Sequence, residues 1–128
     1  MSSRTADRLV RTVLLLIGLL NVAPAAIALL PERIGSTYGV SGLSADAVLM
    51  MRHRAVLLGL VGAGLLLAVW LPRLRMAAIG AAAVSKVSFI ALVFGLGAND
   101  ALTRVAWIDV GALALIGAAA VLVRRVRP

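Results

Sequence analysis

Cysteine is absent from the sequence and histidine occurs once, as His53. Without cysteine there are no disulfide bonds, no thiol redox chemistry and no thiolate metal sites. The same absence argues against a quinone-type reductase, which works through a cysteine pair. A single histidine provides no cluster of ligands for a metal ion or a haem, so we expect no metal and no cofactor.

Acidic residues are scarce: five Asp and Glu stand against 13 Lys and Arg, for a net charge of +8. In a water-soluble protein this excess would suggest nucleic acid as a partner. Here 62% of the 128 residues are hydrophobic and the mean hydropathy is +1.08, which exceeds what a soluble domain of this size needs. Most basic residues flank apolar runs, where they orient helices and meet anionic headgroups. We therefore expect one membrane domain over residues 1–128, with the lipid bilayer as partner and no nucleic acid.

Four apolar runs are long enough to cross a bilayer as helices, at about residues 10–30, 46–71, 76–96 and 102–123. The sequence thus predicts an all-α integral membrane four-helix bundle. Pro24 lacks a backbone donor and should kink the first helix near Asn21. The stretch 32–45 is rich in glycine and serine and should form the longest loop, with Ser44 as the N-cap of the second helix. Asn99 and Asp100 should end the third helix and cap the fourth.

The first apolar run has a second interpretation, as a secretory signal peptide. It follows a basic N-terminus and contains Ala23-Pro24-Ala25, a small-residue sequence of the kind that signal peptidase cleaves. The apolar stretch continues past that point to Leu30, which favours a full-length span.

The basic residues predict the orientation of the bundle. With four spans, both termini and the turn at Pro72 lie on one side of the membrane. That side carries Arg4, Arg8, Arg11, Arg73, Arg75, Arg124, Arg125 and Arg127. The other side carries Arg33 and Arg104, with Arg52 and Arg54 at a helix mouth. The positive-inside rule then places both termini in the cytoplasm of a multi-pass protein of the plasma membrane, the inner membrane of a bacterium.

Small residues recur at four-residue spacing on three of the expected helices, and such ridges let helix backbones approach closely in lipid. The predicted ridges are Ala55, Gly59 and Ala63 on the second helix, Ala81 and Ser85 on the third, and Ala114 and Ala118 on the fourth.

Several polar side chains lie inside the expected spans, where charges are costly and usually face a partner or a wet cavity. At about 1.5 Å per residue, Arg54 lies roughly 12 Å from the start of its helix, and Asp109 lies at a similar depth. Arg52 and Arg54 point to nearly opposite faces, because successive helical residues are about 100° apart. We expect Arg54 to face inward and to pair with Asp109, with Lys86 competing for the same carboxylate.

Two interpretations of this polar group remain open. One is a structural ion pair that fixes the register of the helices. The other is a pocket that opens outward, with Asp109 as acid or base, His53 as proton shuttle and Arg54 as an anion-binding group. In the second case the substrate-binding residues would be Lys86, Asn21, Ser85, Arg52 and Tyr38.

Short sequence stretches resemble small four-helix DoxX-like bacterial membrane proteins. The matching stretches are Leu30-Pro-Glu-Arg-Ile-Gly-Ser-Thr-Tyr-Gly-Val40, Leu49-Met-Met-Arg-His-Arg-Ala-Val-Leu-Leu-Gly59, Val84-Ser-Lys-Val-Ser-Phe89 and the Arg104 to Asp109 spacing. The resemblance implies the four-helix membrane fold. Some such proteins carry the name phosphopantetheine adenylyltransferase, but the sequence has neither a nucleotide-binding loop with histidine nor a soluble α/β domain.

The sequence therefore predicts a pocket that binds a lipophilic small molecule. Whether the pocket also converts it, by acid–base chemistry of the isomerase, cyclase or epoxide-hydrolase type, is left open by the sequence. The alternative is a non-catalytic accessory subunit, which would assemble through its small-residue faces with copies of itself or with other membrane subunits. Ion or proton transport is disfavoured, because Asp109 is the only acid well inside a span and the cytoplasmic halves of the helices are apolar.

Overall fold

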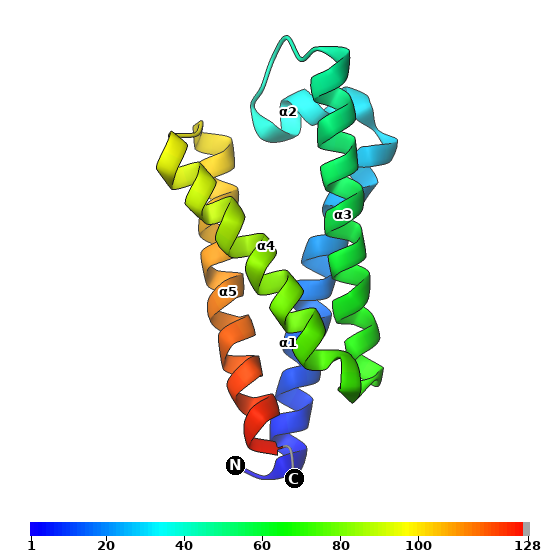
Figure 1. Ribbon diagram of the computed structural model, residues 1–128, viewed down its shortest axis with the longest axis vertical. Helices are drawn as coiled ribbons and strands as arrows, with labels where there is room; N and C mark the ends of the chain where they lie inside the picture. The colour runs from blue at the N-terminus through cyan, green and yellow to red at the C-terminus, as the bar shows by residue number, and fades with distance from the viewer. Residues whose placement is uncertain (127–128) are drawn as a thin grey trace.

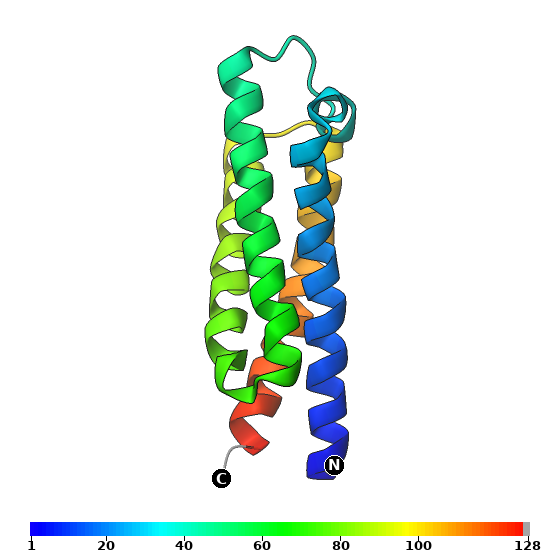
Figure 2. The same cartoon turned by 90° about the vertical axis from the view of Figure 1, so that its right-hand side faces the viewer.

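A computed structural model describes residues 1–126, and these residues form helices without any strand. The α-helices are α1 (Ser3–Val22), α2 (Ile34–Tyr38), α3 (Ala45–Trp70), α4 (Arg75–Leu96) and α5 (Asp100–Val126). Short 3-10 helices connect them: η1 (Ala23–Leu29), η2 (Pro31–Arg33) and η3 (Pro72–Leu74). The start of α1 and the end of α5 lie at one end of the bundle, here called the terminal end, and α2 lies at the other, here called the loop end (Figures 1 and 2).

Four helical segments are long and apolar enough to cross a membrane: Ser3–Leu29, Ala45–Trp70, Pro72–Leu96 and Asp100–Arg125. Their outward faces carry large apolar side chains. Leu60 on α3 is 64% exposed and Val84 on α4 is 72% exposed. A water-soluble bundle would bury such residues, whereas lipid solvates them. The predicted all-α architecture, with four helices long and apolar enough to span a membrane, is confirmed.

The first candidate span, Ser3–Leu29, changes its helical type after Val22, in its loop-end part. α1 ends at Val22, and Pro24 occupies the first turn of η1. Proline has no N–H to donate, so the α-helical hydrogen bonding cannot continue through it. Instead of a single kinked α-helix, the chain continues as a 3-10 helix of 7 residues, longer than the usual three or four.

The expected long loop at residues 32–45 contains the short helix α2. Ile34 is fully buried and Tyr38 is 6% exposed, so this segment packs against the bundle. Gly39 ends α2 in the left-handed conformation, with φ of 65°, which glycine adopts without steric cost. Ser44 then caps α3 as predicted, because its side chain accepts a hydrogen bond from the Ala47 backbone N–H at 3.2 Å.

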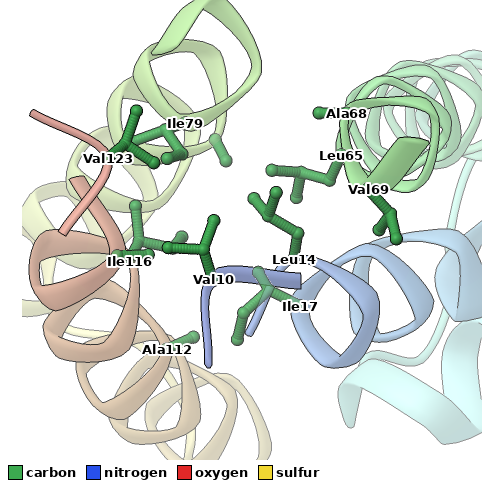
Figure 3. Close-up of a cluster of buried hydrophobic side chains, with 12 residues drawn as sticks. Val10, Leu14, Ile17, Leu65, Ala68, Val69, Ile79, Ala112, Ile116 and Val123 are labelled. Atoms are coloured by element: carbon green, nitrogen blue, oxygen red, sulfur yellow. The ribbon is translucent and has the colours of Figure 1, made fainter. Parts of the chain in front are cut away.

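The hydrophobic core is formed by residues in the parts of the long helices nearer the terminal end, and Figure 3 shows its side chains in close-up. Val10 and Leu14 of α1 lie at its centre, each 1% exposed. The other members come from α1, α3, α4 and α5 and are Ile17, Leu65, Ala68, Val69, Ile79, Ala82, Ala112, Ile116, Ala119 and Val123. Towards the loop end, α4 and α5 diverge from α1 and α3 (Figure 1).

Glycines allow α1 and α3 to cross closely. A Cβ on Gly62 would lie 2.7 Å from the carbonyl oxygen of Gly18 and 2.8 Å from the backbone nitrogen of Val22. A Cβ on Gly59 would lie 2.8 Å from the Cβ of Ala25. These separations leave no room for a side chain.

The predicted small-residue ridges are only partly correct. Gly59 and Ala55 face the bundle, but the other members do not pack in it as expected: Ala63, Ala81, Ala114 and Ala118 are exposed and Ser85 is half-buried. The buried small residues are Gly62, Ala82, Ala112 and Ala119 instead. Several small residues lie on each helix, and their spacing alone does not show which face is covered.

Arg75 lies near the terminal end, and its side chain is buried in the bundle, which the sequence did not predict. It is 7% exposed, and its Nη1 donates to Asp7 Oδ1 at 2.7 Å while its Nε donates to the carbonyl of Ala68 at 3.3 Å. Asp7 also accepts a hydrogen bond from Arg11 Nε at 2.8 Å. Asp7 and the last carbonyls of α3 thus provide acceptors for this guanidinium inside the protein. Arg127 lies outside the described residues.

Candidate functional site

A cavity of about 530 Å³ lies in the loop-end half of the bundle, where the helices diverge. Residues of α1, η1, α2, α3, α4 and α5 line it, so it lies among all the long helices. Most of its wall is apolar, with Leu58, Val61 and Phe89 as examples. Clefts of this size that combine apolar walls with a few polar groups are typical of sites for small molecules.

An ion pair joins α4 to α5 on the cavity wall. Lys86 Nζ lies 2.6 Å from Asp109 Oδ1, and the two side chains are 4% and 15% exposed. We expected Asp109 to pair with Arg54. Lys86 forms the pair instead, because its α4 position lies beside α5 and its long side chain reaches the carboxylate. Both Arg54 and Asp109 line the cavity, but the predicted choice of cation for Asp109 was wrong.

Arg54 lines the cavity from α3, as its predicted inward orientation requires. Its Nη1 donates to the hydroxyl of Tyr38 at 3.3 Å. The guanidinium carbon lies 5.5 Å from the centre of the Tyr38 ring and 4.9 Å from that of Phe89. The quadrupole of each ring attracts the cation at these distances. Aromatic faces, rather than a carboxylate, therefore hold this charge.

Tyr38, Asn21 and Ser85, three of the predicted substrate-binding residues, also line the cavity. Asn21 is 3% exposed, and its Nδ2 donates to the Ile17 carbonyl at 2.7 Å, one helical turn back. That bond leaves its carbonyl oxygen as an acceptor near the cavity.

Two predicted site residues do not line the cavity. Arg52 is exposed and its Nε donates to the carbonyl of Ala28 in η1, at 2.8 Å. His53 is also exposed. Of the three consecutive residues Arg52, His53 and Arg54, only Arg54 therefore faces the cavity. Consecutive helical positions point in different directions.

Phe89 and Asn99 were not predicted as site residues from the sequence. Phe89 lies three residues after Lys86, and that spacing places both on one face of α4. Asn99 was expected only to cap the last helix, and its Oδ1 does accept from the Leu102 N–H at 2.9 Å. Its Nδ2 also donates to the carbonyls of Tyr38 and Gly39, at 2.9 and 3.1 Å. This second role joins segments about sixty residues apart, and no local pattern signals it.

Together these features define a class, a helical bundle with four potential membrane spans and a charged, mostly apolar cavity between its helices. No protein-family model, curated protein or solved structure matches the chain. The resemblance to DoxX-like proteins therefore stays a prediction. Within residues 1–126, no group of three or more His, Cys, Asp or Glu side chains is placed to hold a metal ion.

Proposed function

We propose that this chain is a multi-pass membrane protein whose loop-end cavity binds a lipophilic small molecule. The observation that supports this most is the cavity itself, with a volume of about 530 Å³, apolar walls and an enclosed Lys86–Asp109 pair. Burying two charges beside an apolar void is costly unless they are paired. Membrane-buried ionisable groups that face a cavity are functional candidates for this reason.

The same pair is our candidate for acid–base chemistry on the bound molecule, of the isomerase, cyclase or epoxide-hydrolase type. In that role Asp109 would accept a proton and Lys86 would donate one, both within reach of a ligand in the cavity. His53 has no place in this scheme, because it does not line the cavity. Binding is the primary proposal, and conversion depends on it.

A cavity-filling variant tests the binding site. Ser85→Trp puts an indole into the cavity, while Ala81→Trp puts the same group on an exposed position one turn earlier on α4. Lipid extracted from purified wild type and from Ala81→Trp should contain a bound small molecule in near-stoichiometric amount, measured by mass spectrometry. Ser85→Trp should lack it. Equal lipid content in all three proteins, or no retained molecule in any, would contradict the proposal.

We also propose that the terminal end faces the cytoplasm and that the membrane is the plasma membrane. Exposed arginines at that end support this orientation, among them Arg4, Arg8 and Arg73. Reporter fusions at Ser2 and at the C-terminus should both be cytoplasmic, and a reporter in the Gly42 loop should be outside. Termini on opposite sides would show that the first segment does not span the membrane.

A non-catalytic accessory subunit is the second candidate, and one observation favours it. Ala114 and Ala118 lie on an exposed face of α5, where small residues permit close helix contact. On this hypothesis Ala114→Trp should abolish co-purification of a defined membrane protein that the wild-type chain retains. Unchanged co-purification would remove this candidate.

A further inference from the structure

Three charged side chains line the cavity, and their charges do not cancel. Lys86 and Asp109 neutralise each other. Among the described residues, no carboxylate lies within 4.0 Å of the Arg54 guanidinium nitrogens. The chain has five acidic residues, and apart from Asp7 and Asp109 these are exposed: Glu32, Asp46 and Asp100. The cavity wall thus carries one uncompensated positive charge.

The Arg54 guanidinium retains donors for a ligand. It has five N–H groups, and its one hydrogen bond to the described residues runs from Nη1 to the Tyr38 hydroxyl. The planar fork of a guanidinium matches a carboxylate, with two parallel charge-assisted hydrogen bonds. Tyr38 and Phe89 limit the movement of the group. Arg54 is therefore positioned to bind an anionic head.

Exposed lining residues on α3 and α4 indicate that the cavity has an opening between these two helices. Leu57 of α3 is 49% exposed and Leu92 of α4 is 59% exposed, yet both line the cavity. Because these helices have apolar outer faces, the opening between them leads to the acyl-chain region of the bilayer. An apolar chain can pass there without leaving a lipid-like environment.

We propose that the ligand is a single-chain lipid with a carboxylate head, which Arg54 binds while the chain extends between Leu57 and Leu92. This inference rests on the proposed binding function and adds the chemical class of the ligand. One negative charge matches the one uncompensated positive charge. A phosphate monoester carries about two charges at neutral pH, which leaves an excess in a site of low dielectric. A two-chain phospholipid exceeds a cavity of about 530 Å³.

Three probes that share one chain and differ in head charge test this proposal. Tritiated oleate, oleyl alcohol and oleylamine are titrated onto the purified full chain in neutral detergent, with bound label measured by scintillation proximity. Wild type should bind oleate roughly tenfold to hundredfold more tightly than the alcohol, the range expected for charge-assisted hydrogen bonds. It should bind the amine more weakly than either.

Variants assign the preference to Arg54. Arg54→Met should remove the preference for oleate and leave binding of the alcohol unchanged, which also shows that the variant is folded. Arg54→Lys should retain part of it. Arg104→Met removes an exposed cation that does not line the cavity and should behave as wild type.

The outcomes separate the two proposals. Equal affinities for oleate and oleyl alcohol in wild type, or an undiminished oleate preference in Arg54→Met, would overturn the carboxylate inference and leave the cavity as a lipid site. If Ser85→Trp binds oleate and oleyl alcohol as tightly as wild type does, the two probes bind outside the cavity. That result would overturn both the proposed binding function and the carboxylate inference.

Discussion

Lys86 Nζ lies 2.6 Å from Asp109 Oδ1, with the lysine side chain 4% and the aspartate side chain 15% exposed. The pair joins α4 to α5 at mid-length, beside the cavity and above the apolar core. Each charge compensates the other, so the free-energy cost of burying either charge depends on the presence of its partner.

Removing one member of the pair should destabilise the fold. Asp109→Asn leaves the Lys86 ammonium, 4% exposed, without a counterion, and we expect the free energy of unfolding to fall by about 3–5 kcal/mol. The double variant Lys86→Met with Asp109→Leu should regain most of that loss, because it removes both charges. Tryptophan fluorescence, recorded while the purified proteins unfold in detergent, measures the free energy of unfolding of both variants.

A different outcome would choose between the two interpretations that the sequence leaves open. If Asp109→Asn and the double variant are both as stable as wild type, water in the cavity compensates Lys86. The pair would then not be needed for the register of α4 and α5, and a role towards a ligand would remain.

The crossing of α1 and α3 depends on Gly62. Gly62→Ala places a methyl group against backbone atoms of Gly18 and Val22 at 2.7–2.8 Å, which flexible side chains cannot relieve. We expect the free energy of unfolding to fall by about 1–3 kcal/mol in this variant, as for other overpacked sites. Gly117→Ala is the matched control, since nothing lies within 4 Å of its added Cβ and alanine favours helix. Equal unfolding temperatures for both variants would show that α1 and α3 do not cross at Gly62.

The Asp7–Arg75 pair should make stability depend on acid pH. The hydrogen bond from Arg75 lowers the pKa of Asp7 below its ordinary value of 3.8. Asp7 lies at the terminal end of the candidate span Ser3–Leu29, among the polar and basic residues that precede the apolar run expected at about residues 10–30. A lowered pKa contributes stability that is fully present well above the unfolded value and is lost as the pH falls through the folded value.

Thermal unfolding of wild type and Asp7→Asn over a range of pH tests this. The unfolding temperature of wild type should exceed that of Asp7→Asn by a constant amount near neutral pH. This difference in unfolding temperature should shrink once the pH falls below 3.8. Arg11→Met removes only the exposed partner of Asp7 and should cost less than Asp7→Asn. A difference that persists unchanged into acid would show that the Asp7 charge is not what stabilises this end.

The helices and their caps followed from local properties of the sequence. Apolar length predicted the spans, and Ser44 and Asn99 were identified as caps from their side-chain chemistry. The helical rise placed Arg54 and Asp109 at similar distances from the loop end, and both line the cavity. Such features depend on residues close in the chain, so the sequence contains what is needed to predict them.

Features that depend on the rotation of each helix relative to its neighbours could not be predicted from the sequence. The choice of Lys86 over Arg54 as the partner of Asp109, and of Gly62 over Ala63 at the crossing, requires the rotation of each helix about its axis. Hydrophobic patterning usually fixes that rotation, but α3 and α4 are apolar on nearly every face. The burial of Arg75 depends on Asp7 in another helix and was missed for the same reason.

The last prediction concerns Asn99, which caps α5 and also holds the end of α2 at the loop end of the bundle. Asn99→Asp keeps an oxygen for the Leu102 N–H but loses the donors to Tyr38 and Gly39. Asn99→Ala loses both. We expect hydrogen exchange in residues 34–40 to accelerate in both variants, and only Asn99→Ala to lose about 1 kcal/mol from the missing cap. Wild-type protection of residues 34–40 in Asn99→Asp would show that packing of Ile34 and Tyr38, rather than the Asn99 amide, holds α2 in place.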